Sequence, residues 1–504
     1  MPNVLHDALF APLARRETPL LYTPDGKTIS GSEFYRLILR YAATLAGLGL
    51  KPGDRLAVQI EKSPEALALY GAAVTSGVIF LPLNTAYTAA EVRYFVEDSG
   101  ASLLIGDADR AATLQGVADG ANAMFLTMNA DGSGSFADKA AIMPETFTPV
   151  ARGAEDLAAF LYTSGTTGRS KGAMLSHRNL LSNTEILVQE WRFTAADVLL
   201  HALPIFHTHG LFVASNVIFM SGGSMIFLPS FKLDEIIRFL PQASSMMGVP
   251  TFYTRLLDDQ RFNRELTSHM RLFTSGSAPL LAETHIAFET RTGHRILERY
   301  GMTETNMNTS NPYDGERRAG TVGFPLPGVE LKITDPQTGE TLAQGETGMI
   351  EVRGPNVFQG YWQMPEKTRE ELRDDGFFIT GDMGVIDSDG YVSIIGRQKD
   401  LIITGGYNVY PKEIELIVDE HPKVLESAVI GLPHPDFGEA VACVIVPEKG
   451  ATVDIAEIEA LMQETLARFK QPKAIFIVDE LPRNTMSKVQ KNLLRDTYCD
   501  HFSK

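Results

Sequence analysis

Cysteine is scarce in this sequence, and long apolar runs and an excess of positive charge are missing from it. The 504 residues include only Cys443 and Cys499, which cannot build a disulfide framework or a multi-cysteine zinc site. No apolar stretch reaches the roughly 18 residues of a membrane-spanning helix. A net charge of −17 argues against broad binding to nucleic acid or to a membrane, because such partners attract basic surfaces. We therefore expect a soluble globular protein whose anionic ligands meet local positive charge.

A secretory signal is also not recognisable at the N-terminus. The first 17 residues place Asp7 within their apolar part and Arg15 and Arg16 after it, which reverses the order of a secretory signal. A large acidic chain with so few cysteines fits a reducing compartment. We expect a cytoplasmic location, and a mitochondrial presequence is the alternative.

The Gly-Lys-Ser/Thr triplet of the Walker A motif is missing as well, which disfavours an ordinary P-loop NTPase. In its place, the run YTSGTTGRSKG, residues 162–172, follows the apolar stretch 157–161. Glycine lets backbone N–H groups approach an anion, while hydroxyls add donors and Arg169 adds charge. A surface turn rich in serine, threonine and glycine is the alternative. We expect a cradle for a nucleotide phosphate, made of Thr163, Ser164, Gly165, Thr166, Thr167, Gly168 and Lys171.

Strand-like and helix-like segments alternate through the first 300 residues. Residues 55–60 form the first such strand, and Ser63 as N-cap with Pro64 at the first helical position begins the next helix. This order is typical of parallel sheets covered by helices, whose ligands lie beyond the carboxyl ends of the strands. We predict an α/β protein of doubly wound sheets, with strands near 78–83, 102–105, 198–203, 224–228, 245–249, 272–275 and 296–300, and helices near 88–98 and 210–220.

The character of the sequence changes after about residue 329. Short strands separated by turns then predict a β-rich subdomain at about 320–397; they lie near 329–334, 348–352 and 390–395. The last hundred residues or so predict a compact α+β domain, with helices beginning at Pro411 and near 455–469 and strands near 428–431, 440–446 and 474–478. The polar stretch 398–400 between these two units suits a hinge.

Four further segments follow the cradle in a familiar order. They are RYGMTET (299–305), FFITGDMG (377–384), GRQKDLIITGG (396–406) and PRNTMSKVQK (482–491). With the cradle they resemble the motifs of the acyl-adenylate-forming enzymes over nearly the whole chain. The resemblance implies a large N-terminal domain, 1–397, a hinge at 398–400 and a small mobile C-terminal domain, 401–504. It also implies an acid–thiol ligase that uses ATP, Mg²⁺ and coenzyme A and releases AMP and pyrophosphate.

The resemblance assigns roles to individual residues. A carboxylate needs a good leaving group before a thiol can attack it, and adenylation supplies one through positioned cations around the phosphates. Catalytic roles fall to Thr167, Lys171, Glu304 and Lys488, with Glu304 also holding the metal. Taken singly, each such residue has an ordinary structural role as its alternative. Tyr300 would stack on the adenine, Asp382 and Arg397 would hold the ribose, and the nucleotide site would also include Ser277, Ala278, Gly301 and Thr303.

By the same resemblance, Lys488 belongs to a domain that rotates between two half-reactions. The lysine would reach the α-phosphate and the acid during adenylation, and would leave when the domain turns about Lys399. The channel for coenzyme A would then be lined by Thr404, Gly405 and Gly406. Ser487 replaces the usual glycine, and a left-handed turn there would cost serine about 1 kcal/mol more. Some bacterial relatives are acetylated at this lysine, which makes a lysine acetyltransferase a candidate partner.

Three segments resemble the malonyl-CoA synthetases within this superfamily: 201–216, 275–281 and 297–312. Arg299 stands where many relatives have a small or neutral residue, and a dicarboxylic acid needs a cation for the carboxylate that does not react. Arginine can hold that carboxylate with two parallel hydrogen bonds. We expect malonate or methylmalonate in a pocket of Arg299, His207, Ser277, Thr208 and Met307. A core histidine at 207 and plain packing at 307 are the alternatives.

Other functions fit the same motifs. The chain could ligate another short acid to coenzyme A, or could load a separate carrier protein, since no carrier domain follows Lys488 in this sequence. A nucleotide-binding regulator with the same fold is the non-enzymatic alternative, and Ser487 would be its first sign of decay. The intact Lys171, Glu304 and Asp382 favour an enzyme.

Overall fold

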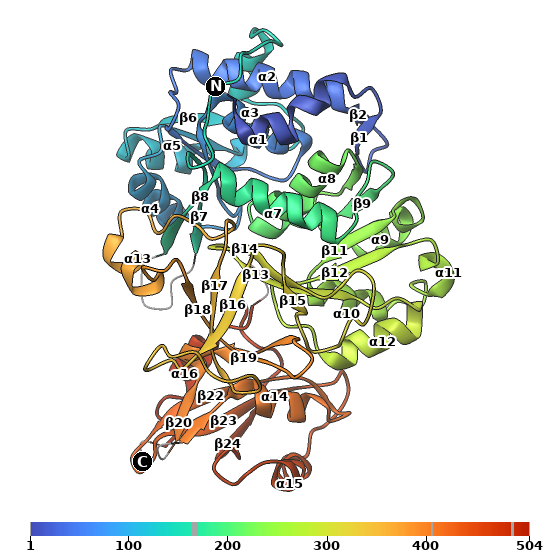
Figure 1. Cartoon of the computed structure of the whole chain (residues 1–504), viewed down its shortest axis with the longest axis vertical. Coiled ribbons are helices and arrows are strands. Elements are labelled where there is room, and N and C mark those ends of the chain that lie inside the picture. The colour runs from blue at the N-terminus through green and yellow to red at the C-terminus, as the bar shows by residue number, and fades with distance from the viewer. Residues whose placement is uncertain (1, 164–169, 405–406, 485–487, 503–504) are drawn as a thin grey trace.

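The structure is a computed structural model that describes residues 2–163, 170–404, 407–484 and 488–502. Figure 1 shows a large body formed by the N-terminal and central parts of the chain. The C-terminal part, coloured orange to red, forms a smaller body beneath it. The predicted organisation, an α/β protein with a large N-terminal and a small C-terminal domain, is confirmed.

The first sheet is largely parallel, as the alternating sequence predicts. It contains β3 (Arg55–Gln59), β4 (Ile79–Pro82), β5 (Leu103–Gly106), β6 (Met124–Thr127), β7 (Leu157–Thr163) and β8 (Lys171–Ser176). Its order along the described strands is β6-β5-β3-β4-β7-β8. The pair β7–β8 is antiparallel and the other neighbours are parallel. The antiparallel pair flanks the predicted phosphate cradle, so the cradle connects two strands at one edge of this sheet.

The second sheet carries most of the predicted acid pocket. It contains β1 (Pro19–Tyr22), β2 (Thr28–Ser30), β9 (Val198–His201), β10 (Ser224–Phe227), β11 (Ser245–Gly248), β12 (Leu272–Ser275), β13 (Leu297–Met302), β14 (Asn306–Ser310) and β15 (Phe324–Pro325). The order of these described strands is β15-β14-β13-β12-β11-β9-β10-β1-β2. The strands from β9 to β13 pair in parallel, whereas β13, β14 and β15 pair antiparallel. The hairpin β13–β14 was not predicted.

Two smaller sheets follow in the chain. The first falls within the predicted β-rich stretch and is antiparallel throughout its described strands, β16 (Glu330–Thr334), β17 (Gly348–Arg353), β18 (Phe378–Ile386) and β19 (Val392–Arg397). The second forms the C-terminal domain from β20 (Ile402–Thr404), β21 (Tyr407–Val409), β22 (Val424–His434), β23 (Gly438–Pro447) and β24 (Ala474–Ile477). Within it β24 pairs in parallel with β23, whereas the other described pairs are antiparallel, as is typical of an α+β unit.

Local sequence signals account for several helix boundaries. Ser63 caps α3 and accepts from the Ala66 N–H, and Thr88 forms a capping box with Glu91 at α4. The helices are α1 (Val4–Leu9), α2 (Gly31–Gly47), α3 (Pro64–Ser76), α4 (Ala89–Ser99), α5 (Ala111–Gly120), α6 (Ser135–Ala141), α7 (His177–Glu190), α8 (Asn216–Ser221), α9 (Leu233–Phe239), α10 (Pro250–Leu257), α11 (Arg264–Thr267), α12 (Ala282–Thr292), α13 (Pro365–Glu371), α14 (Pro411–Asp419), α15 (Ile455–Thr465) and α16 (Lys491–Tyr498).

Two predicted helices differ from the structure. The helix expected at 210–220 is a π-helix, η3 (His209–Ser215), followed directly by α8. Gly210 allows the close approach there, since a Cβ would lie 2.0 Å from the Pro204 carbonyl oxygen. The helix expected at 455–469 ends at Thr465, because Leu466 is extended and turns its side chain into the core. Apolar periodicity alone did not reveal either change.

The largest buried apolar cluster joins the first two sheets. It includes Phe80 of β4, Leu199 of β9 and Phe219 of α8, each at most 3% exposed. Packing of this density holds the two sheets at a fixed separation, so residues at their strand ends keep a defined geometry. Among the described helices, none is long and apolar enough to cross a membrane.

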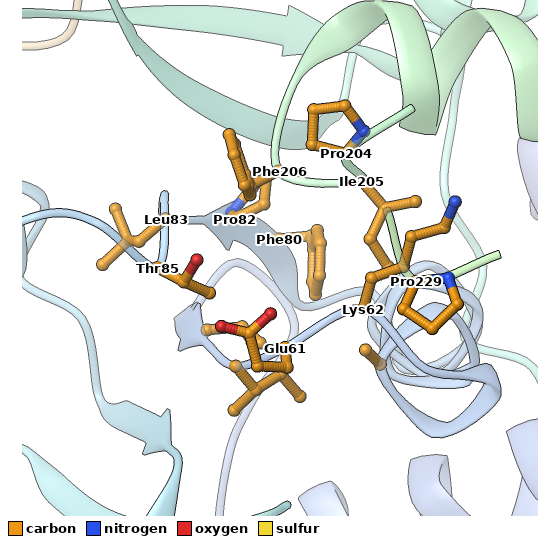
Figure 2. A pocket seen from close by; sticks show the side chains of 13 residues that line it. Glu61, Lys62, Phe80, Pro82, Leu83, Thr85, Pro204, Ile205, Phe206 and Pro229 are labelled. Atoms are coloured by element: carbon orange, nitrogen blue, oxygen red, sulfur yellow. The ribbon is translucent and has the colours of Figure 1, made fainter. Parts of the chain in front are cut away.

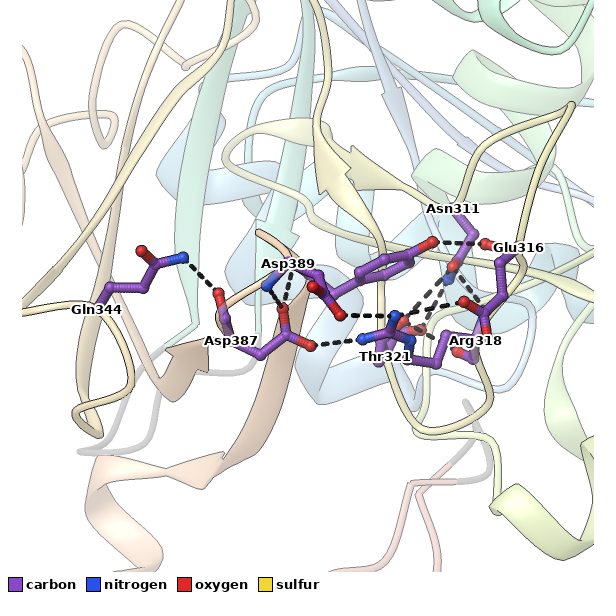
Figure 3. Close-up of polar contacts among 8 residues, drawn as sticks. Asn311, Glu316, Arg318, Thr321, Gln344, Asp387 and Asp389 are labelled. Carbon is purple, nitrogen blue, oxygen red and sulfur yellow. Dashed lines mark hydrogen bonds and ion pairs between the residues drawn. The ribbon is translucent and has the colours of Figure 1, made fainter.

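A polar cluster fastens the chain that follows β14 to the turn between β18 and β19 (Figure 3). Arg318 Nη1 lies 2.8 Å from Asp387 Oδ2, and its Nη2 lies 3.0 Å from Asp389 Oδ2. Glu316 is a third carboxylate partner of Arg318, and the guanidinium also lies 4.1 Å from the centre of the Tyr391 ring. These contacts tie the second sheet to the β-rich sheet that carries Asp382.

Candidate functional site

Three predicted nucleotide-binding residues meet where β13 approaches β18 and β19. The Tyr300 hydroxyl donates to Asp382 Oδ2 at 2.6 Å, and Arg397 Nε lies 2.7 Å from Asp382 Oδ1. Asp382 and Arg397 face each other in the β18–β19 register. Burial and the Asp382 charge raise the pKa of Tyr300, so its hydroxyl remains a donor. The Asp382 carboxylate is therefore held on both oxygens and faces a fixed direction.

Glu304 belongs to a second polar cluster that also contains a cradle residue. The Tyr361 Oη atom lies 3.0 Å from Glu304 Oε1 and 2.6 Å from Glu371 Oε2. Lys171 Nζ lies 3.0 Å from each oxygen of Glu371 and 4.0 Å from the centre of the Tyr361 ring. The cluster thus links the predicted metal ligand, in the turn between β13 and β14, to the predicted phosphate ligand, the first residue of β8.

The two glutamates of this cluster differ in their electrostatic environment. Burial raises the pKa of Glu304, and the Tyr361 hydroxyl and the Lys171 charge offset part of that rise. Burial by itself would raise the pKa of Glu371 as well. Hydrogen bonds from Tyr361 and Lys171 outweigh this effect and lower the pKa of Glu371. Glu371 is therefore an anion at neutral pH. Its counter-ions are Lys171 and Lys367, whose Nζ atoms lie 3.0 Å and 3.1 Å from Glu371 Oε1.

The guanidinium of Arg299 is buried and incompletely paired. The residue is 3% exposed, and neither Nε nor Nη2 has a hydrogen-bond partner among the described residues. Burial lowers the pKa of Arg299 to about 9, which still leaves it charged at neutral pH. A Cβ at Gly276 would lie 2.3 Å from Arg299 Cζ, so glycine is needed where the guanidinium packs. Because an unpaired buried cation is costly, this geometry indicates a place for an anion.

Histidines line the same region from the loop after β9. Burial lowers the pKa of His207 to about 3, with smaller contributions from the charges of Lys488 and Arg299. His209, which sequence analysis did not single out, also has a lowered pKa, through burial and then the Arg299 charge. Both imidazoles are therefore neutral near pH 7, and each can donate one hydrogen bond.

Ser277 connects the histidine loop to the segment after β12. Its Oγ atom lies 3.2 Å from His209 Nδ1, and its backbone adopts a left-handed conformation at φ 71°. Non-glycine residues rarely adopt that conformation outside constrained sites. Two further atoms, His209 Nε2 and Thr208 Oγ1, are buried without a partner in the described part of the chain. Together with Arg299 they provide several unused polar atoms in one region.

Met307 lies on β14, which pairs with the strand that carries Arg299. The residue is 2% exposed, and its Cε atom would lie 2.6 Å from a Cβ at Gly301. Its side chain therefore packs beside the C-terminal end of β13.

Lys488 faces these clusters from the C-terminal domain. Although it retains solvent access, loss of hydration lowers the pKa of Lys488, and the Arg397 charge lowers it further. Asp382 and Glu304 act in the opposite direction. Asn484 fixes the backbone nearby, since its Oδ1 accepts from the Lys488 N–H at 3.0 Å. The ammonium is thus close enough to sense both the nucleotide cluster and the histidine loop.

Other predicted residues lie at the edges of the site or outside the described chain. Thr163 ends β7 opposite Lys171, and Ala278 and Thr303 are half-buried after β12 and β13. Lys399 lies in the short 3₁₀ turn η5 (Gln398–Asp400), and Thr404 is buried in β20. The predictions for Ser164, Gly165, Thr166, Thr167, Gly168, Gly405, Gly406 and Ser487 fall outside the described residues.

A small apolar pocket lies next to the histidine loop (Figure 2). Its volume is about 60 Å³, and Phe206, the residue before His207, forms part of its lining. Ligand sites usually measure about 300–1,000 Å³, so a nucleotide cannot fit. Lys62 also lines it, and its Nζ donates to the His201 carbonyl oxygen at 2.8 Å. This buried contact fastens β9 to the first sheet and so supports the loop that carries His207.

Several residues that the structure brings to the site were not predicted from the sequence. His209 was visible as the second histidine of the HTHG segment, two residues after His207. Tyr361 and Glu371 had no motif to indicate them. Gly276 was missed because its role depends on the side chain of Arg299, which lies in another strand.

Comparison with known proteins finds two matching family models. The model for AMP-binding enzymes matches residues 12–362, and the model for the C-terminal domain of AMP-binding enzymes matches residues 413–488. A malonate–CoA ligase from Arabidopsis thaliana is 36% identical over 488 residues, which cover 89% of this chain and 79% of the relative. A long-chain-fatty-acid–CoA ligase from Bacillus subtilis (strain 168) is 33% identical, with 95% of this chain and 92% of the relative covered.

Solved structures of MatB from Rhodopseudomonas palustris are also similar to this chain. The ATP-bound form matches with a TM-score of 0.98 at 57% identity, and 100% of both chains is covered. The apo form of that protein matches at the same identity and coverage with a TM-score of 0.86. Because the sequence identity is equal, the difference reflects the arrangement of the chain. The arrangement described above, with Lys488 facing the site, is closer to the ATP-bound form.

Proposed function

Because this chain belongs to the family of AMP-binding enzymes, we propose that it is an AMP-forming malonate–CoA ligase. ATP and malonate first form malonyl-adenylate with release of pyrophosphate, and the thiol of coenzyme A then displaces AMP. Methylmalonate is the candidate second substrate. Family membership does not select the acid, since relatives of similar identity are named for malonate and for long-chain fatty acids.

The unpaired guanidinium of Arg299 is the observation that favours a dicarboxylic acid as substrate. Its buried Nε and Nη2 atoms, free of partners among the described residues, can donate two hydrogen bonds to the carboxylate that does not react. His209 Nε2 is a further unused atom nearby. A monocarboxylic acid would leave the guanidinium buried and unpaired. Charge-assisted hydrogen bonds contribute about 1.5–3 kcal/mol each, so two of them favour a dicarboxylic acid by a hundredfold or more.

The depth of the pocket then selects a short dicarboxylic acid. The buried Thr208 lies on the histidine loop, and Met307 packs beside β13. In this proposal the distal carboxylate binds Arg299, and these two side chains limit the acid to a one-carbon spacer before the reacting carboxylate. Malonate has that spacer, and methylmalonate adds one methyl group to it.

Adenylation uses the residues around the nucleotide cluster. Asp382 and Arg397 hold the ribose hydroxyls, and Tyr300 presents its ring to the adenine. Lys171, Thr167 and Lys488 surround the phosphates, where positive charge and donors stabilise the charge that spreads over the α-phosphate and pyrophosphate. The remaining cradle residues, together with Ser277, Ala278, Gly301 and Thr303, complete the nucleotide site.

The residues around Glu304 fit a Mg²⁺ ion that arrives with ATP. Among the described residues, no group of three or more metal-ligating side chains occurs, but Mg²⁺ commonly uses one or two carboxylates plus substrate phosphates. Glu304 is a buried carboxylate beside Tyr361 and so suits that single protein ligand. When bound, the ion neutralises negative charge on the phosphates.

Thioester formation requires Lys488 to leave and a channel for coenzyme A to open. We place the hinge at 398–400, about Lys399, with the N-terminal domain at 1–397, its β-rich subdomain at about 320–397 and the mobile domain at 401–504. Thr404, Gly405 and Gly406 line the channel after the rotation. A cytoplasmic location and a lysine acetyltransferase acting on Lys488 belong to the same proposal, and the solvent access of Lys488 favours the latter.

The test is AMP formation with ATP, Mg²⁺ and coenzyme A over malonate, methylmalonate, succinate, acetate and octanoate. We expect malonate to dominate by at least a hundredfold over acetate. Activity confined to a monocarboxylic acid would refute the role of Arg299 while retaining the ligase chemistry. No AMP with any acid would refute the ligase and favour a nucleotide-binding regulator.

A further inference from the structure

A carboxylate that the proposed chemistry does not use lies against Lys171. Glu371 is the last residue of α13, and Lys171 is the first residue of β8. Lys171 Nζ lies 3.0 Å from both oxygens of Glu371, and the two side chains are 16% and 22% exposed. This contact joins a phosphate-site residue to a helix from the β-rich part of the chain. A carboxylate beside a phosphate site repels the ligand, so its presence needs a reason.

The ring of Tyr361 covers another side of the same ammonium group. Lys171 Nζ lies 4.0 Å from the ring centre, within the range of a cation–π contact. The Tyr361 hydroxyl lies 2.6 Å from Glu371 and 3.0 Å from Glu304. Glu371 and Tyr361 therefore form a two-sided seat for Lys171, which we call the lysine seat. Its hydroxyl edge adjoins the carboxylate that suits Mg²⁺.

We propose that Glu371 is a positioning residue for the ATP half-reaction: with Tyr361, it holds Lys171 extended toward the phosphate site before ATP binds. A lysine has a flexible four-carbon stem and loses rotamer freedom when it is ordered. The lysine seat orders the stem before ATP binds, so the loss of rotamer entropy does not weaken ATP binding. The inference rests on the proposed function, in which Lys171 contacts the phosphates.

The first experiment compares Glu371→Gln with a neighbouring control. Glu366→Gln is that control, because it removes an exposed carboxylate from the same helix, α13. We expect Glu371→Gln to reduce kcat/KM for ATP in malonate-dependent pyrophosphate exchange about 10- to 100-fold, from the loss of one charge-assisted contact. Thioester formation from preformed malonyl-adenylate and coenzyme A should change less than about twofold, because Lys171 has no role in it. Equal losses in both half-reactions would overturn the proposal.

A double-mutant cycle tests whether Glu371 acts through Lys171. In a Lys171→Ala background, Glu371→Gln should have almost no further effect, because the group that it positions is gone. An undiminished effect in that background would contradict the positioning role. Where exchange by Lys171→Ala is too slow to follow, equilibrium binding of ATP with Mg²⁺ to the same four proteins completes the cycle.

Two conservative variants separate the parts of the lysine seat. Glu371→Asp keeps the charge on a shorter stem and should recover part of the exchange rate lost in Glu371→Gln. Tyr361→Phe keeps the ring over Lys171 but removes the hydroxyl, and it should give a smaller loss than Glu371→Gln. Wild-type rates in Glu371→Gln, or a larger loss in Tyr361→Phe, would show that the carboxylate does not position Lys171.

The positioning role of Glu371 and the proposed function can fail separately, and the experiments distinguish the two failures. If wild-type protein adenylates an acid other than malonate, the choice of acid fails, and the same exchange assay proceeds with that acid. If the wild type adenylates no acid, the ligase fails, and the binding cycle with ATP still decides whether Glu371 positions Lys171.

Discussion

At the scale of single residues, burial decides what each charged side chain can do. Arg299 is 3% exposed with two unpaired donor atoms, whereas Arg397 is paired with Asp382 at 2.7 Å. The first guanidinium therefore lacks a protein partner and suits an anionic ligand, whereas the second already orients the Asp382 carboxylate beside which we place the ribose. Arginine thus has a different role at each of the two positions, and the difference comes from burial and hydrogen-bond partners.

Replacing Arg299 with alanine should affect dicarboxylic acids selectively. The loss of two charge-assisted hydrogen bonds predicts a decrease in kcat/KM for malonate of a hundredfold or more, with less than a tenfold change for acetate. Steady-state AMP formation with both acids measures the two effects. Parallel losses for both acids would show that Arg299 has a structural role instead.

Gly276→Ala should reproduce part of that effect without touching Arg299 directly. The new Cβ would meet the guanidinium at 2.3 Å, so Arg299 must move, and we expect KM for malonate to rise about tenfold. Gly116→Ala is the matched control, because nothing lies within 4 Å of a Cβ there. If KM for malonate is unchanged in Gly276→Ala, the close packing of Arg299 on Gly276 does not matter for binding.

At the scale of elements, irregular structure positions the acid pocket. The π-helix η3 begins at His209, and Gly210 within it approaches the Pro204 carbonyl oxygen. Single-turn π-helical segments often occur at functional sites. The hairpin β13–β14 then sets Met307 beside the strand that carries Arg299. Regular helices and strands form the scaffold, whereas these exceptions shape the pocket.

Arg318→Ala tests how much the ion pairs between the second sheet and the β18–β19 turn contribute to stability. Removing the guanidinium leaves three carboxylates near one another, those of Glu316, Asp387 and Asp389. Because one guanidinium offsets the repulsion among these carboxylates, we expect the midpoint of urea denaturation to fall in this variant. Arg178→Ala, which breaks one exposed pair with Glu155, should change it by less than about half of that. Equal effects would indicate that the cluster adds nothing to isolated pairs.

At the scale of the whole molecule, the C-terminal domain completes the site. Lys488 comes from the last motif of the chain, yet its charge acts on His207 in the loop after β9. The similarity to the ATP-bound MatB, at a TM-score of 0.98 against 0.86 for the apo form, agrees with this arrangement. In the proposed function, motion of this domain decides which half-reaction can proceed.

Lys488→Ala should separate the two half-reactions. Loss of the ammonium removes charge stabilisation at the α-phosphate, so malonate-dependent pyrophosphate exchange should fall by a factor of about 10³ or more. Conversion of preformed malonyl-adenylate and coenzyme A to the thioester should remain within about threefold of wild type, because the rotated domain removes Lys488 from the site. Loss of both reactions would refute the assignment of this lysine to adenylation alone.

The pH dependence of global stability should reflect His177. Burial lowers the pKa of this histidine to about 4, against about 6.5 in an unfolded chain. As the pH falls from about 6.5 to 4, the unfolded state takes up a proton that the native state does not, so stability decreases by up to about 3 kcal/mol. His177→Gln should flatten this part of the curve of unfolding free energy against pH. Identical slopes for variant and wild type between pH 7 and 5 would contradict it.

Sequence and tertiary structure determined different parts of this protein. The order of strands and helices, the caps at Ser63 and Thr88, and the predictions for the cradle and for Arg299 rest on local patterns. Propensity and motif chemistry act over a few neighbouring residues. The acyl-adenylate-forming family was recognisable from motifs in order, and the family match confirms it.

Only the tertiary structure decided which of these residues meet and which remain unpaired. The lysine seat joins residues 200 positions apart, and Tyr300 reaches Asp382 across 82 positions. The hairpin β13–β14, the π-helix η3 and the burial of Arg299 likewise depend on packing between distant segments. Burial, hydrogen-bond partners and electrostatic environment are properties of the folded space around a residue, so they were not readable from the residue's neighbours in the sequence.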